Sequence, residues 1–236
     1  MTSFVLKIIA MVTMFCDHFG DAFIGHFSFL NLIGRIAFPI FAFQISEGFK
    51  HTKNVKKYFG RLLIFAVISQ IPFYLFSKKF GLATDGLNIF FTLLLGLSCI
   101  SIYNYFSKFE NKELSFRLFG IELKNYFGLA LVLAIACIGE VLNVDYGFWG
   151  VIVIFSFYLF KDNKLGVIMS FIALCILRYG SWIILYGFNV LYILLCIFTI
   201  LPLLFIGLYN GKQGKKIKYL LYLFYPLHLL MLYFLF

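Results

Sequence analysis

Hydrophobic residues form long runs along most of this chain, and short polar stretches separate the runs. A helix that crosses a bilayer needs roughly 20 mostly apolar residues. The pattern predicts nine such helices, at residues 4–24, 28–48, 58–77, 88–106, 126–142, 146–160, 165–178, 185–209 and 217–236. The sixth and seventh are short, which leaves open that one or both are tilted, re-entrant or half-buried. We therefore expect an all-α polytopic transmembrane bundle that forms a single integral-membrane domain over residues 1–236.

The composition supports a lipid environment. Hydrophobic residues make up 63% of the chain and charged residues 13%, and the mean hydropathy is +0.97. A soluble domain is closer to half apolar and a quarter charged, and one of this length could not hide so much apolar surface. These numbers exclude an ordinary soluble enzyme and a disordered chain. No small-residue cleavage site follows the first apolar run, so we expect that run to remain as a helix.

The basic residues predict the orientation in the membrane. The formal net charge is +10, and the positive residues collect in alternate connections, as cytoplasmic loops do. These connections hold Lys50, Lys53, Lys56, Lys57, Arg61, Lys108, Lys112, Arg117, Lys124, Lys161, Lys164, Lys212, Lys215, Lys216 and Lys218. The asymmetry predicts a multi-pass protein of the cytoplasmic membrane with its N-terminus in the cytoplasm and its C-terminus outside. Because topology explains the positive charge, we expect no nucleic-acid partner.

Ionisable residues inside the predicted helices are the first candidates for a functional site, because lipid disfavours them unless they are paired or wet. In the first helix, Lys7, Met11, Met14, His18 and Asp21 follow one another at steps of four and three, which places them on one face. His18 lies about 9 Å from the outer end at about 1.5 Å per residue. Asp21, one turn further out, is positioned to orient its imidazole.

A second candidate pair combines two predicted helices. Asp17 points about 100° away from His18, and Arg35 of the second helix lies at a similar depth, about 10 Å from the outer end. An arginine there needs an anionic partner, and Asp17 is the nearest candidate in the sequence. Pro39 follows one turn later and is expected to kink the helix. The pair is equally compatible with a purely structural role, since membrane bundles use polar contacts for helix packing.

Two further groups of polar residues are candidates for binding. Residues expected to contact a substrate, most of them in the outer half, are Gln70, Asn88, Glu140, Asp145, Arg178 and His228, the last also interpretable as a buried structural histidine. Residues near the cytoplasmic ends form a basic cluster, which is interpretable as a lipid-headgroup anchor or as a phosphate clamp for a cofactor. Its members, with neighbouring polar residues, are Lys7, Glu47, Lys50, His51, Lys53, Lys56, Lys57 and Arg61.

Motifs of common soluble enzymes are absent from the sequence. There is no P-loop, no Gly-x-Gly-x-x-Gly, no HExxH and no Gly-x-Ser-x-Gly, which argues against an ATPase or a metalloprotease. The five cysteines lie in apolar runs without CxxC spacing, and the four histidines are scattered. We therefore interpret the cysteines as small hydrophobic residues and expect no metal site.

Several strings distributed over most of the chain, densest in the first 100 residues and thin between 100 and 140, resemble the TraX family. They are Leu6-Lys7-Ile8-Ile9-Ala10 with Met14, Asp17-His18-Phe19-Gly20, Ile33-Gly34-Arg35-Ile36-Ala37-Phe38-Pro39, Glu47-Gly48-Phe49 with His51-Thr52, Tyr58 with Arg61-Leu62-Leu63, Ser69-Gln70-Ile71-Pro72, Asn88 with Phe91-Thr92 and Gly96, Asp145-Tyr146-Gly147, and Tyr225-Pro226-Leu227-His228-Leu229. Any one string is weakly specific, whereas the combination is specific.

The resemblance implies a membrane protein related to the pilin N-acetylases of conjugation systems in the inner membrane. It also implies a distant similarity to transmembrane acyltransferases, which pass acetyl from cytosolic acetyl-CoA to an acceptor outside. The Asp17-His18 and Arg35 strings carry over as the expected catalytic site, with acetyl-CoA as co-substrate. The acceptor, whether peptide, glycan or small molecule, stays open.

Residue pattern and resemblance together suggest one mechanism. His18 would deprotonate an amine or hydroxyl, or carry the acetyl group, Asp17 or Asp21 would fix its tautomer, and Arg35 would stabilise the oxyanion or anchor Asp17. Two alternatives stay open: a small proton- or cation-coupled transporter or flippase, and a non-catalytic accessory protein of pilus assembly or export. A transporter is disfavoured by the lack of visible internal repeats.

Overall fold

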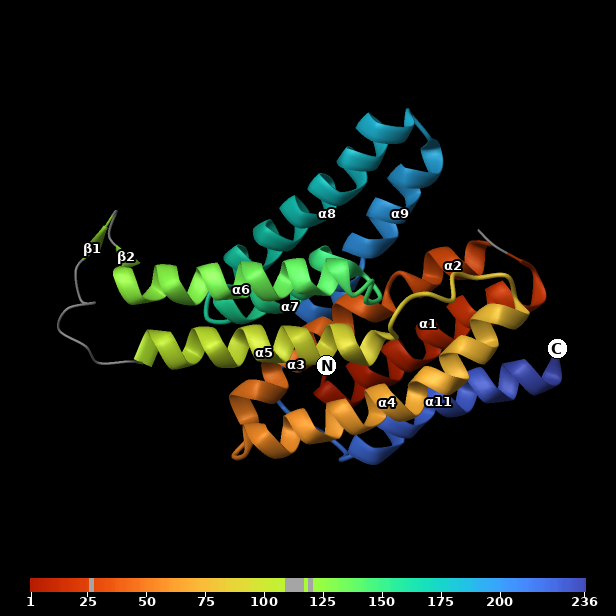
Figure 1. Ribbon diagram of the computed structural model, residues 1–236, viewed down its shortest axis with the longest axis horizontal. Coiled ribbons are helices and arrows are strands. Elements are labelled where there is room, and N and C mark those ends of the chain that lie inside the picture. Colours follow the sequence, from red (N-terminus) through yellow and green to blue (C-terminus); the bar gives the residue numbers. More distant parts are fainter. Residues whose placement is uncertain (26–27, 109–116, 119–120) are drawn as a thin grey trace.

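The computed structural model describes residues 1–25, 28–108, 117–118 and 121–236, and within these ranges the chain is almost entirely helical (Figure 1). The helices are α1 (Ser3–Phe23), α2 (Phe29–Gly34), α3 (Ala37–His51), α4 (Val55–Lys79), α5 (Ile89–Lys108), α6 (Leu123–Val141), α7 (Gly147–Leu159), α8 (Lys164–Tyr186), α9 (Val190–Ile200), α10 (Pro202–Gly207) and α11 (Lys218–Leu235). Two short strands, β1 (Arg117–Leu118) and β2 (Ile121–Glu122), pair antiparallel. The other residues of the polar connection 109–120, with Lys112, lie outside the described ranges.

The nine apolar segments expected from the sequence are confirmed. Seven helical segments of the described chain are long and apolar enough to cross a membrane, and two shorter apolar helices, Gly147–Leu159 and Tyr219–Leu235, complete the set. The expectation that the seventh segment, 165–178, is short is wrong, because α8 continues past Arg178 to Tyr186 and has 23 residues in all. Arg178 and the small residues after it interrupt the apolar pattern without ending the helix. We call the end where α1 begins and α3 ends the inner end of the bundle, and the opposite end the outer end.

The second span is broken at Arg35 and Ile36, between α2 and α3. A proline ring clashes with the carbonyl four residues earlier and removes a backbone donor. Pro39 therefore disfavours a regular helix at Arg35, which is where the interruption lies, so the kink expected from Pro39 is confirmed. The break matters for the site because it turns the backbone at the one arginine of this span.

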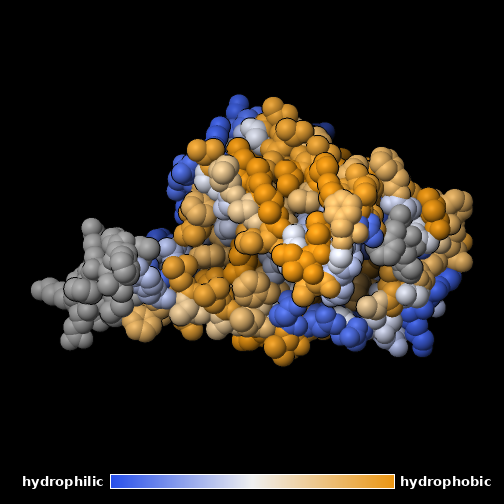
Figure 2. All heavy atoms as spheres, turned by 90° about the horizontal axis from the view of Figure 1, so that it is seen from above, coloured by the Kyte–Doolittle hydropathy of each residue, from blue (hydrophilic) through white to orange (hydrophobic). Residues whose placement is uncertain are grey.

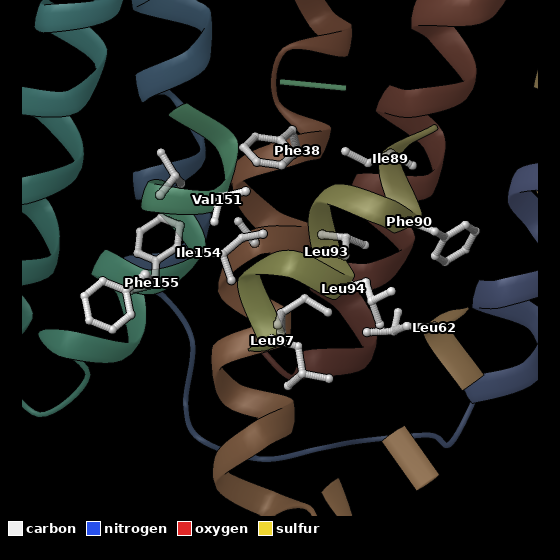
Figure 3. Close-up of a cluster of buried hydrophobic side chains, with 14 of the residues drawn as sticks. Phe38, Leu62, Ile89, Phe90, Leu93, Leu94, Leu97, Val151, Ile154 and Phe155 are labelled. Atoms are coloured by element: carbon white, nitrogen blue, oxygen red, sulfur yellow. The ribbon is translucent and has the colours of Figure 1, made fainter. Parts of the chain in front are cut away.

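The centre of the bundle is formed by α5, which packs against α3, α4, α6 and α7. Figure 3 shows Leu93 and Leu97 of α5 beside Ile154 of α7, with Phe38 of α3 at one edge of the cluster. Gly96 permits this approach, because a Cβ at that position would lie 2.5 Å from Ile154. A close-packed core of this kind holds the surrounding helices in fixed relative positions.

The hairpin of α8 and α9 leans away from the other helices in Figure 1 and contacts them mainly through α7 and α2. Large apolar side chains are exposed on it, for example Ile184 at 84% and Phe188 at 72%. The face seen in Figure 2 is largely hydrophobic. Such a surface is expected where lipid replaces water as the solvent.

The N-terminus is attached to the connection between α10 and α11. The backbone N–H groups of Ser3 and Phe4 donate to the carbonyls of Lys212 and Gln213 at 2.9 and 3.0 Å, and Met1 contacts Leu208 and Asn210. Two glycines of this connection, Gly211 and Gly214, have positive φ angles of 74° and 69°. These contacts place residues 208–217 across the inner end of the bundle.

Candidate functional site

Asp17 and Arg35 form the ion pair expected from the sequence. The Nη2 atom of Arg35 donates to both carboxylate oxygens of Asp17, at 2.8 and 2.7 Å, and its Nε donates to the backbone carbonyl of Asn31 at 3.1 Å. Gly34 makes room for the carboxylate, since a Cβ there would lie within 2.3–2.5 Å of Asp17. The ion pair thus links α1 to the end of α2.

Asn31 connects this pair to Asp21. Its amide nitrogen donates to Asp17 Oδ1 at 3.1 Å and to Asp21 Oδ1 at 2.8 Å, and the residue is 9% exposed. Its side-chain oxygen accepts from the backbone N–H of Ser28, in a capping box at the start of α2. Sequence reasoning missed Asn31, although a serine followed three residues later by a polar amide is a recognisable signal of a helix start.

His18 contacts a second histidine. Its Nδ1 lies 2.8 Å from Nε2 of His228, whose own Nδ1 lies 2.7 Å from the carbonyl oxygen of Phe224. A carbonyl only accepts, so His228 Nδ1 carries a hydrogen; in the neutral ring Nε2 then accepts from His18 Nδ1–H. The lone pair of His18 is thereby left on Nε2, and no hydrogen bond from the described residues reaches that atom.

The structure therefore corrects the expected orientation of His18. The partner on its Nδ1 is His228, whereas Asp17 is bound to Arg35 and Asp21 to Asn31. His228 is 4% exposed. The sequence could not select this partner, because α1 and α11 are separated by almost the whole chain and meet only in the folded bundle.

A cavity of about 1010 Å³ lies at the inner end, between α1, α3, α4, α5, α11 and the connection 208–217. Cationic side chains line it, among them Lys53, Arg61 and Lys216, together with many aromatic and apolar side chains. Met14, one turn before His18, and Tyr225 also line it. The Tyr225 ring lies 6.2 Å from the His18 ring and 5.7 Å from the His228 ring. The cavity therefore extends to Tyr225, whose ring lies beside both histidine rings.

The candidates for cofactor binding separate into two groups. Those that line the cavity are Lys7, Glu47, His51, Lys53 and Arg61, and those that do not are the exposed residues Lys50, Lys56 and Lys57. Glu47 also interacts with Tyr209, and burial, together with this carboxylate, raises the pKa of Tyr209 to about 12. Lys216 and Tyr225 were not among the candidates, although the string that contains His228 places Tyr225 three residues away on the same helix face.

Three candidates for substrate binding are engaged in backbone contacts. Gln70 and Asn88 bond to each other at 2.7 Å and also bond to Gly86, Ala66 and Phe90, which fixes the connection before α5. Glu140, exposed near the end of α6, accepts at 2.7 Å from the N–H of Phe148 at the start of α7. These contacts assign all three side chains a part in positioning helix ends.

Asp145 lies in the connection between α6 and α7, close to the ion pair. Its backbone N–H donates to Leu87 at 2.8 Å, and its carbonyl accepts from the hydroxyl of Thr92. Burial raises the pKa of Asp145 to about 6, although Arg35 and Arg178 oppose the shift. The outer polar layer thus joins residues of α1, α2, α8 and this connection. Among the described residues, no three His, Cys, Asp or Glu side chains come together as a metal-binding group.

Fold and site together define an integral membrane protein: an all-helical polytopic bundle with a basic cavity at one end and a polar layer at the other. The chain belongs to the TraX family, described as "TraX protein", which matches residues 3–236. This confirms the resemblance identified in the sequence strings. No solved structure matches the chain.

A curated relative links the chain to a pilus-related protein. Over 115 residues the chain is 37% identical to a protein of Dichelobacter nodosus, "Probable fimbrial assembly protein FimC, serogroup H1". The match covers 43% of this chain and 46% of the relative, so it spans about half of either protein. The similarity supports family membership and a multi-pass membrane protein.

Proposed function

We propose that the chain is a membrane-embedded acyltransferase that moves an acetyl group from cytosolic acetyl-CoA to an amine or hydroxyl acceptor at the outer side. The observation that carries the proposal is the basic cavity whose wall includes Tyr225, directly beside the His18–His228 pair. The fimbrial assembly role in the name of the relative is compatible with a pilus-related acceptor, and the family resemblance suggests the N-terminus of a pilin-like peptide. The inner end would face the cytoplasm, and the bilayer would surround the bundle.

The charge and the apolar lining of the cavity support acetyl-CoA as the donor. The phosphates of acetyl-CoA would contact Lys53, Arg61 and Lys216, where cationic donors suit anionic oxygens. The uncharged pantetheine arm would follow the apolar lining toward Met14, and the thioester would lie beside Tyr225. A hydroxyl at this position can donate a hydrogen bond to the oxygen that becomes negatively charged in the transition state.

The histidine pair would supply proton transfer. His18 Nε2 would accept the proton of the acceptor amine or hydroxyl while its nitrogen or oxygen bonds to the acetyl carbon. The carbon–sulfur bond breaks, and the departing thiolate takes the proton from His18 to leave free CoA. His228 holds His18 in the tautomer that keeps Nε2 basic. Of the two roles expected for Arg35, the ion pair with Asp17 corresponds to the anchoring role. Oxyanion stabilisation is given in this proposal to Tyr225, which lines the cavity.

The test uses purified protein in nanodiscs with labelled acetyl-CoA and short peptide amines as acceptors. Wild type is expected to cleave the thioester and label the peptide. His18→Ala is expected to reduce transfer by about 10²–10⁴-fold, the range for loss of a positioned base, while CoA binding and the melting temperature stay close to wild type. Full activity in this variant would overturn the mechanism. Flux of a solute without thioester cleavage would favour a transporter, and CoA binding without either would favour an accessory protein.

A further inference from the structure

Arg178 of α8 is the second arginine in the outer half of the bundle, and the groups that contact its guanidinium differ in kind from those around Arg35. It lies eight residues before the end of α8, about 12 Å from that end at 1.5 Å per residue, and it is half-buried. Among the described residues, no carboxylate forms an ion pair with Arg178, and its hydrogen bond to the Tyr146 carbonyl oxygen is long, at 3.5 Å. A guanidinium at this depth is costly without an anion or water.

Three aromatic rings surround the guanidinium. Its central carbon lies 4.7 Å from the ring centre of Trp149, 5.2 Å from that of Trp182 and 5.8 Å from that of Tyr146. Aromatic faces attract a cation, but they do not accept the N–H bonds that project from the edges of the guanidinium plane. The three rings therefore stabilise the charge without accepting the hydrogen bonds that the guanidinium can donate to a ligand.

The rings of this aromatic cage (Tyr146, Trp149 and Trp182) are held by other contacts. Trp149 Nε1 donates to the carbonyl oxygen of Leu174 at 2.9 Å. The ring centres of Tyr146 and Phe38 are 4.0 Å apart, and those of Trp182 and Tyr192 of α9 are 5.6 Å apart. A cage that is fixed before binding loses little conformational entropy when a ligand enters.

Asp145 is the carboxylate that interacts electrostatically with Arg178, but it does not pair with it. Its backbone is fixed by Leu87 and Thr92, and its side chain also interacts with Asp17 and Arg35. Arg178 is thus left with a weak internal acceptor, an aromatic cage and a neighbouring carboxylate that is shared.

We propose that Arg178 and its aromatic cage bind an oxyanion, a carboxylate or phosphate group, in the outer half of the membrane. The planar guanidinium offers two parallel N–H donors, which match the paired oxygens of such groups. The group can belong to an anionic lipid headgroup or to a soluble molecule that enters from outside. This site does not depend on acyl transfer; if transfer occurs, an acceptor with an anionic group would be held here.

The two tryptophans of the chain are Trp149 and Trp182, so tryptophan fluorescence reports directly on this cage. The protein in phosphatidylcholine nanodiscs is titrated with inorganic phosphate and with acetate. A second set of nanodiscs contains phosphatidylglycerol. A saturable change in emission with either soluble anion supports binding from solution, and a change with phosphatidylglycerol alone supports a lipid headgroup.

Two variants and a control decide the assignment. Arg178→Gln is expected to abolish the response, and Arg178→Lys to weaken the affinity by about tenfold because the bidentate contact is lost. Lys161→Gln is the control, because Lys161 also stacks on an aromatic ring, Tyr158 at 3.9 Å, but not on a tryptophan; it should respond like wild type. No response of wild type in any lipid, or an equal response of Arg178→Gln, would overturn the proposal. If Arg178→Gln does not fold, unchanged affinity in Arg178→Lys would overturn it.

Discussion

The inner and outer halves of the bundle satisfy their charged residues in different ways. At the inner end, Lys53, Arg61 and Lys216 line a cavity and form no ion pair with the described residues. In the outer half, Arg35 is bound by Asp17 through two contacts, and Asn31 extends the network. A charge that is fully paired inside the protein has little capacity left for a ligand, whereas an unpaired charge in a cavity is available to one.

The difference divides the intramembrane polar residues into three roles. The ion pair of Asp17 and Arg35 holds α1 against α2, the cavity offers the volume and charge for a donor, and the His18–His228 pair lies beside the cavity wall. Depth in the membrane alone would place all of these residues in one site. The contacts show instead that the ion pair supports the region where the histidines are positioned. Variants of each group should therefore affect different measurements.

The largest expected effect is on stability, from the outer half. Asp17→Ala leaves Arg35 without its counter-ion, and we expect the free energy of unfolding to fall by about 3 kcal/mol or more. Lys124→Ala is a matched control, because the Lys124–Glu122 pair has similar side-chain exposure, 15% and 29% against 27% and 15%, but lies at the inner end of α6. That variant should cost less than Asp17→Ala, because Lys124 is the second residue of α6 and its pair lies at a helix end, not within a span.

Thermal melts in detergent measure both variants. A double variant, Asp17→Ala with Arg35→Met, should recover a large part of the loss, because the uncompensated charge is gone. If the Asp17 and Lys124 variants melt at the same temperature, the ion pair does not hold the helices, and the separation of roles fails.

The next effect is on the rate of transfer and comes from the contact between α1 and α11. His228→Phe fills a similar volume but removes the acceptor for His18 Nδ1–H, so the imidazole is no longer held in one tautomer. We expect the turnover rate with labelled acetyl-CoA to fall by about 100-fold, comparable to the loss of a supporting contact. CoA binding should be unchanged. A purely structural role for His228 would instead alter the melting temperature and leave the pH profile of the rate as in wild type.

A smaller effect is expected at the cavity. Arg61→Gln removes one cation from the lining and should raise the KM for acetyl-CoA by about tenfold with little change in the turnover rate. Lys108→Gln, at the same end of the bundle but outside the cavity lining, serves as the control. The difference between them should shrink at high salt, because screening weakens exposed charges. An equal KM for both variants would contradict donor binding in this cavity.

The helices of this protein were more predictable from the sequence than the side-chain contacts between them. Lipid requires long apolar runs and internal backbone pairing, so each span is visible in the pattern of residues alone. The one clear error, the early end of α8, arose because Arg178 interrupts the apolar run. Trp182, four residues later on the same helix, was a local sign of support for it, whereas the contact with Trp149 of α7 is not visible in the sequence. The break beside Pro39 was predictable because its cause lies within the same helix.

The site was predictable where its parts are close in the sequence. Asp17 and Arg35 lie on consecutive helices of opposite direction, so their depths could be compared and the pair was found. His228 could not be assigned to His18, because nothing in one sequence specifies that α11 packs between α1 and α4. Asp21 was the better choice by spacing, but the amide of Asn31 binds it.

The smallest expected effect is the pH dependence contributed by Asp145. Burial raises its pKa from 3.8 to about 6 in the folded protein, so the folded state binds this proton more tightly than the unfolded state does. The stabilisation is fully present below the ordinary pKa and is lost as the pH rises through about 6. Asp145→Asn carries no such proton, and its melting temperature should change less than that of wild type between pH 5 and about pH 7.5. Parallel pH curves for the two proteins would show that the pKa of Asp145 is not raised by burial, and the outer half would then differ less from the inner end in how it holds its carboxylates.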